Sequence, residues 1–82
     1  MFRILTEDVN RPAIFKILDA RINGYTVTPA LGVWKGQHEN SLAIDVVGYT
    51  GKTVKVIAEE IKAVNKQESV LVLCIPSETR FV

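Results

Sequence analysis

Two apolar segments separated by a short polar one, in residues 24–48 (GYTVTPALGVWKGQHENSLAIDVVG), constrain the fold more than any other feature. On each side of the polar segment KGQHEN (residues 35–40), side chains alternate with the period of two that is typical of a β-strand. The polar segment contains Gly36, which can adopt positive φ, so residues 35–40 are expected to form a turn. The stretch therefore predicts a β-hairpin. Pro29 lacks an amide hydrogen, which places the first strand of the hairpin at a sheet edge or at a bulge.

A strand and a helix precede this hairpin, and a helix and a strand follow it. Residues 2–7 and 69–75 have the composition of strands, and residues 11–22 and 52–65 have the apolar period of amphipathic helices. The predicted helical stripes consist of Ile14, Ile17, Leu18 and Ile22, and of Val54, Ile57, Ile61 and Val64. The order β-α-β-β-α-β predicts one domain of the α+β class, a ferredoxin-like sandwich. Its antiparallel sheet has strand order 4-1-3-2 and two helices on one face. Residues 77–82 form a tail that the pattern does not assign.

The ends of the helices carry recognisable capping residues. Asn10 is the best candidate for the N-cap of the first helix, and Pro12 fits its first turn. Asn23 and Gly24 end this helix, because both residues tolerate a left-handed conformation. For the second helix, Thr50 and Thr53 are both candidate caps.

Symmetric closure of the hairpin around residues 35–40 places Trp34 opposite Ser41 and Pro29 opposite Val46. One face then carries Val27, Pro29, Leu31, Val33, Leu42, Ile44 and Val46. This apolar face is expected to lie beneath the helices. The other face carries Thr28, Ala30, Gly32, Trp34, Ser41, Ala43, Asp45 and Val47.

The second face of the hairpin is a candidate subunit interface. A chain of 82 residues buries only about 60–65% of its unfolded surface, so its own core leaves a thin stability margin. Its single cysteine excludes an internal disulfide. The predicted interface residues are Ala30, Gly32, Trp34, Ala43 and Asp45, with Val70 and Val72 of the last strand; Leu71, Leu73 and Ile75 are the alternative set from that strand. A monomer with an unusually apolar exposed sheet is the competing interpretation. Asp45 needs a partner on this face, and Arg3 of the first strand is the candidate.

Charge and cysteine content bear on partners and location. The formal charge of +1 comes from dispersed residues, so the sequence predicts neither nucleic-acid nor membrane-surface binding. The strand 41–49 has no aromatic residue before Tyr49, which argues against an RNA-recognition module. Cys74 lies in an apolar run and is expected to be a buried thiol in a reducing compartment. The sequence lacks a signal-peptide pattern and an apolar run of membrane-spanning length, which predicts a cytoplasmic protein.

Residues 48–53 (GYTGKT) have the composition of a phosphate-binding loop but not its spacing. A phosphate-binding loop has four residues between its glycines, whereas here two residues separate Gly48 from Gly51. The start of a capped helix explains these residues better.

Residues of the hairpin turn, together with Lys52 at the start of the second predicted helix, are candidate ligand contacts. The predicted ligand-binding residues are Lys35, Gly36, His38, Glu39 and Lys52. A solvated turn is the simpler interpretation of His38 and Glu39, because a metal or acid–base site needs partners that the sequence does not place beside them. No catalytic residue, metal or cofactor is predicted, although binding of an unidentified small molecule is compatible with the pattern.

Several of these residues carry a resemblance to a known family. The run Val27-Thr28-Pro29, the run Trp34-Lys35-Gly36, Glu39 and the apolar strand 42–47 resemble CutA-type proteins, and so the wider PII-like group. This resemblance implies a ferredoxin-like fold and a trimer, and it extends to a signalling role. The cysteine before the proline and the long nucleotide-binding loop of PII proteins are absent, so metal and nucleotide binding are not transferred. The chain is also similar to short bacterial and phage proteins.

The expected function is an oligomeric binding or regulatory module without catalysis. The first alternative is an enzyme or sensor that uses a metal or nucleotide at clefts between subunits. The second alternative is a structural component of a phage or host assembly.

Overall fold

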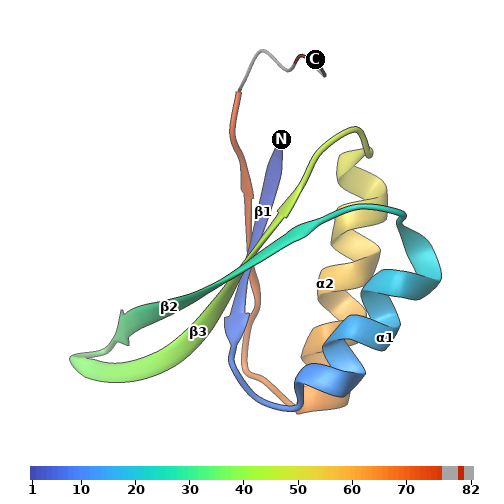
Figure 1. Cartoon of the computed structure of the whole chain (residues 1–82). Coiled ribbons are helices and arrows are strands. Elements are labelled where there is room, and N and C mark those ends of the chain that lie inside the picture. Colours follow the sequence, from blue (N-terminus) through green and yellow to red (C-terminus); the bar gives the residue numbers. More distant parts are fainter. Residues whose placement is uncertain (77–79, 81–82) are drawn as a thin grey trace.

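The computed structural model describes residues 1–76 and residue 80 as an α+β fold with two helices and four strands (Figure 1). The elements are β1 (Phe2–Glu7), α1 (Arg11–Arg21), β2 (Thr26–Trp34), β3 (Gln37–Val46), α2 (Gly51–Asn65) and β4 (Leu71–Cys74). This element order confirms the order expected from the sequence. Apart from Arg80, the tail 77–82 lies outside the described residues.

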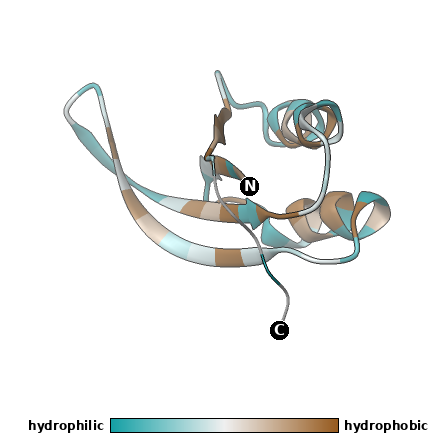
Figure 2. Ribbon diagram, turned by 90° about the horizontal axis from the view of Figure 1, so that it is seen from above, coloured by the Kyte–Doolittle hydropathy of each residue, from teal (hydrophilic) through white to brown (hydrophobic). Residues whose placement is uncertain are grey.

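The four strands form one open sheet in which every neighbouring pair is antiparallel. Its order is β2-β3-β1-β4, which becomes β4-β1-β3-β2 when it is read from the opposite edge. Strand β2 is an edge strand, as Pro29 indicated. Both helices lie on one side of the sheet, and the β2–β3 hairpin extends away from them (Figures 1 and 2).

The hydrophobic core lies between the helices and the sheet. It contains Ile4, Ile14, Leu18, Ile22, Leu42, Ile44, Val46, Val54, Ile57 and Ile61, all of which are buried. Full burial of one such side chain contributes about 1.5–3 kcal/mol to folding. Two members of the predicted apolar helical stripes do not belong to this buried core. Ile17 is only partly buried, and Val64, in the last turn of α2, is exposed.

The two helices begin in different ways. In α2 the side chain of Thr50 accepts a hydrogen bond from the Thr53 amide at 3.3 Å, which identifies Thr50 as the cap. In α1 the cap is Asn10, as expected, but it has a left-handed backbone and its side chain makes no capping hydrogen bond. Instead, Asp8 and Arg11 form an ion pair at 2.7 Å beside this end of the helix.

The hairpin turn is shorter than the sequence pattern indicated. Trp34 is paired with Gln37 and Pro29 with Leu42, so the turn consists of Lys35 and Gly36 alone. Both turn residues have positive φ, 49° and 74°, which is characteristic of the type I′ turn that suits the twist of a two-residue hairpin. The predicted pairing with Ser41 and Val46 was therefore wrong by four residues. Because four is an even number, the division of side chains between the two faces is nevertheless the predicted one.

The shorter turn produces a projecting hairpin. Strand β1 pairs with β3 only as far as Ser41, opposite Glu7, so the hairpin continues without a third strand. We call residues 31–40 the hairpin arm (Figure 1). Leu31 and Val33 lie on the helix-side face, as predicted, but they are 65% and 61% exposed. The prediction that they belong to the core was wrong, because the arm extends past the helices that would cover them.

Candidate functional site

The sheet face opposite the helices, which we call the outer face, carries side chains from all four strands. In β4, Leu71 is paired with Leu5 and Leu73 with Arg3, and both leucines are exposed. Val72 is instead paired with the buried Ile4, and it packs against the core together with Val70. The prediction that Val70 and Val72 contribute to the outer face was therefore wrong, because the register of β4 turns Val72 toward the helices and Val70 also packs against the core. The leucines take their place.

Arg3 and Asp45 form the predicted ion pair on the outer face. Arg3 Nε donates to Asp45 Oδ1 at 2.7 Å, and its Nη2 donates to Oδ2 at 3.1 Å. The hydrogen bond to this carboxylate raises the pKa of Arg3 above its ordinary value. The charge partner of Asp45 thus comes from a neighbouring strand of the same chain.

The other predicted interface residues also lie on the outer face. Ala43 is paired with Thr28, and Ala30, Gly32 and Trp34 follow at alternate positions along β2. Trp34 is 58% exposed, and Lys35 Nζ lies 6.0 Å from the centroid of its ring. This part of the face combines small side chains with one accessible aromatic ring.

A cleft of about 340 Å³ lies where the hairpin arm leaves the sheet. The arm, the end of β1 and the segment leading into β4 line this arm-root cleft, which consists of Leu5, Glu7, Gly32, Val33, Trp34, Glu39, Ser41, Gln67, Glu68, Ser69, Val70 and Leu71. A Cβ atom added at Gly32 would lie 2.8 Å from Ser41 Oγ, so glycine leaves space for the neighbouring side chain. The cleft thus combines apolar and aromatic surface with carboxylates from three separate parts of the chain.

Gln67 fixes one wall of the arm-root cleft. This residue is only 8% exposed, and its Nε2 donates to the buried Thr6 Oγ1 at 2.7 Å. Its Oε1 accepts a hydrogen bond from the Glu7 amide at 3.3 Å. These two bonds tie the segment before β4 to the end of β1.

Three glutamate carboxylates line the cleft. Among the described residues, the carboxylates of Glu7, Glu39 and Glu68 form neither an ion pair nor a side-chain hydrogen bond. The sequence had singled out Glu39, but Glu7, Gln67 and Glu68 were missed. They meet only because β1 and β4 are neighbours in the sheet, and no local spacing in the sequence signals this.

The five predicted ligand-binding residues do not form one site. Lys35 and Gly36 make the turn, while His38 and Glu39 are strand residues of β3, with side chains on opposite faces. Lys52 lies near the start of α2, at the other end of the molecule from the arm (Figure 1). The structure therefore separates Lys52 from the other four candidates and leaves only Lys35 and Gly36 in the turn itself.

Residues 48–53 serve the start of α2. A Cβ atom at Gly51 would lie 3.2 Å from the ring of Phe2, a tight contact, so glycine favours close packing of the helix on β1. Together with the Thr50 cap, this packing accounts for the glycine and threonine that resemble a phosphate-binding loop.

Cys74 is exposed near the end of β4. The prediction of a buried thiol was wrong, because Cys74 lies in an edge strand and near the end of the sheet. Residues 1–76 and 80 contain no group of three His, Cys, Asp or Glu side chains that could hold a metal ion. Neither α1 nor α2 has both the length and the apolar character that a membrane-spanning helix needs.

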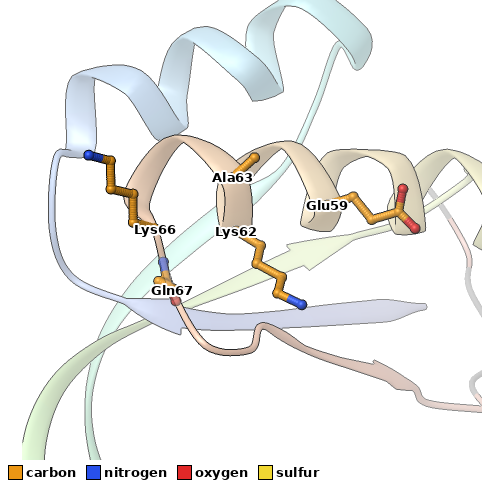
Figure 3. A pocket seen from close by; sticks show the side chains of 5 residues that line it. All are labelled: Glu59, Lys62, Ala63, Lys66 and Gln67. Atoms are coloured by element: carbon orange, nitrogen blue, oxygen red, sulfur yellow. The ribbon is translucent and has the colours of Figure 1, made fainter.

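A second hollow, of about 390 Å³, lies along the last turns of α2 (Figure 3). Glu59, Lys62, Ala63, Lys66 and Gln67 line it. The ammonium groups of Lys62 and Lys66 point in different directions (Figure 3). This hollow does not focus charge on one point, so the arm-root cleft is the better candidate site.

Comparisons with known protein families, with curated proteins and with solved structures gave no match to this chain.

Proposed function

We propose that this chain is a binding or regulatory module of ferredoxin-like topology that acts without catalysis as a homo-oligomer. The order of helices and strands and the strand neighbours in the sheet support this topology. The resemblance to CutA-type and PII-like proteins implies a trimer. The contact between subunits is proposed to involve the hairpin arm.

The exposure of Leu31 and Val33 carries this proposal. Their side chains are 65% and 61% exposed on a two-stranded projection that no helix covers. An isolated two-stranded hairpin is marginally stable in water, and aliphatic side chains gain free energy when another surface covers them. A second copy of the chain is the simplest partner that is always present, and most soluble oligomers consist of identical subunits.

The arm offers little support for the rival function of a metal- or nucleotide-using enzyme. Such an enzyme needs polar side chains that converge on one reacting group. His38 and Glu39, the polar pair that the sequence singled out, lie on opposite faces of β3.

Light scattering after size exclusion tests the proposal. The unmodified chain is expected to elute with a mass that is a multiple of 9.1 kDa. The double variant Leu31→Thr/Val33→Thr places β-branched, strand-favouring side chains at both positions but removes apolar surface, and it should shift the mass toward 9.1 kDa. Val64→Thr makes a similar change at an exposed residue of α2 and should leave the mass unchanged.

A third variant locates the contact. Ala43→Arg places a large charged side chain on the outer face, the interface that the sequence pattern favoured. Dissociation by this variant and not by the arm variant would move the contact from the helix-side face of the arm to the outer face. A 9.1 kDa mass for the unmodified chain would overturn the oligomer itself.

A further inference from the structure

We propose that the arm-root cleft binds a small organic cation, an ammonium or guanidinium group on an aliphatic chain. This inference does not require the oligomer, because the whole lining belongs to a single chain, although Val33 both lines the cleft and belongs to the proposed subunit contact. Three properties of that lining identify the ligand class: its charge, its apolar surface and its fixed shape.

The charge of the lining selects a cation. Glu7, Glu39 and Glu68 come from three different segments and line the same cleft, and no lysine or arginine is among the described residues that line it. Like charges gathered in a concave site produce a focused field that attracts the opposite charge. A bound ammonium or guanidinium group could donate charge-assisted hydrogen bonds to these carboxylates.

The uncharged lining selects a ligand with an apolar body. Leu5 and Leu71 provide aliphatic surface, and Trp34 provides an aromatic ring, within the same cleft as the carboxylates. Aliphatic stems of cationic groups pack on such surface while their heads stay near charge and water. Trp34 is 58% exposed, and the ammonium of Lys35 at 6.0 Å from its centroid shows that a cation can approach this ring.

The size and rigidity of the cleft suit a small molecule. Its volume of about 340 Å³ is at the lower end of the range of ligand pockets. Gln67 holds one wall through its bonds to Thr6 and to the Glu7 amide. Gly32 contributes no side chain to the opposite wall, so the space between the arm and β4 stays open. A site that is already formed loses little conformational entropy when a ligand binds.

Fluorescence of Trp34 reports directly on this cleft, because it is the only tryptophan of the chain. The full chain is titrated with spermidine, a free polyamine, and separately with acetyl-Gly-Arg-Gly-amide, which presents a basic side chain. We expect a saturable change with at least one of these probes, and the stronger response identifies the source of the cation. Butyrate, butanol and magnesium chloride at matched ionic strength should give no saturable change.

Variants then test the role of the carboxylates. Glu39→Gln/Glu68→Gln keeps side-chain volume and should weaken the apparent affinity by about fivefold or more. Glu59→Gln makes the same change on α2, outside this cleft, and should bind like the unmodified chain. Gly32→Val should also weaken binding, because its side chain fills the cleft.

Two results would overturn the cation site. One is the absence of a saturable change with both cationic probes up to millimolar concentration. The other is a response that butyrate or magnesium reproduces, or that the double glutamine variant leaves intact. Light scattering on the same samples keeps a failure of the cleft distinguishable from a failure of the oligomer.

Discussion

Arg3 and Asp45 are directly opposite one another in β1 and β3, and two hydrogen bonds of 2.7 and 3.1 Å join their side chains. The pair lies on the outer face of the sheet, on the two central strands. A one-residue slip of β1 against β3 would move Arg3 to the helix side and separate the charges. The ion pair therefore supports the register that buries Ile4 and Ile44.

A double-mutant cycle tests this pair. Arg3→Leu and Asp45→Leu are made singly and together, and unfolding in urea is followed at low and high salt. The loss of unfolding free energy in the double variant should be smaller than the sum of the losses in the two single variants, because each single variant leaves one charge unpaired. The favourable coupling should fall as salt rises. Strictly additive effects at low salt would mean that the two side chains do not interact in solution.

The exposure of the arm makes a clear prediction about core and arm substitutions. Under conditions that dissociate the oligomer, Leu31→Ala should change the free energy of unfolding by less than about 0.5 kcal/mol. Ile44→Ala, on the same face of the same hairpin, should cost about 2–5 kcal/mol, because Ile44 is fully buried. Urea unfolding of both variants in parallel gives the comparison. Equal losses would place Leu31 in the core after all.

The pairs Arg3–Asp45 and Leu31–Ile44 show how much of the fold could be predicted from the sequence. The period of two in the hairpin predicted which residues share a face, and it survived a register error of four residues because parity was preserved. The length of the turn could not be predicted in the same way. The polar run from His38 to Asn40 has the composition of a turn, and only tertiary geometry shows that it continues β3 as a strand.

The cleft shows a different limit. Glu7 and Glu68 are 61 positions apart, and their approach depends on the pairing of β1 with β4 and on the side chain of Gln67. The sequence contains each of these residues but no local pattern that joins them. Conversely, the placement of Asp45 beside Arg3 was predictable, because each residue lies in a strand whose alternation was clear.

Substitutions in the turn should have opposite effects. The left-handed backbone of Lys35 costs free energy, because lysine rarely adopts this conformation. Lys35→Asn should therefore stabilise the arm by an amount of the order of 1 kcal/mol or less, since asparagine tolerates the conformation. Gly36→Ala should destabilise the arm by about 1 kcal/mol, because φ is 74° at this position. Hydrogen exchange of the arm amides measures both effects. Faster exchange in Lys35→Asn would contradict the two-residue turn.

The Tyr25 hydroxyl should titrate late. It donates a hydrogen bond to Asp19 Oδ1 at 2.6 Å, and this bond, with burial and the nearby negative charge, raises the pKa of Tyr25 from 10 to about 12. The protonated form is therefore favoured in the folded state. Its contribution to stability is fully present below pH 10 and is lost as the pH rises to about 12.

Ultraviolet absorbance of tyrosinate follows this titration. Asp19→Asn removes the negative charge next to Tyr25, so the late step should move toward the ordinary tyrosine range. Tyr25→Phe should remove the step. Its persistence in Tyr25→Phe would assign it to another tyrosine.

The most direct test of the proposed function is the mass of the unmodified chain in solution, measured by light scattering over a series of dilutions. We predict a mass that is a multiple of 9.1 kDa, with three copies as the number that the family resemblance implies, and a decline toward 9.1 kDa on dilution. A mass of 9.1 kDa at every concentration would contradict the account, because Leu31 and Val33 would then be exposed on a monomer.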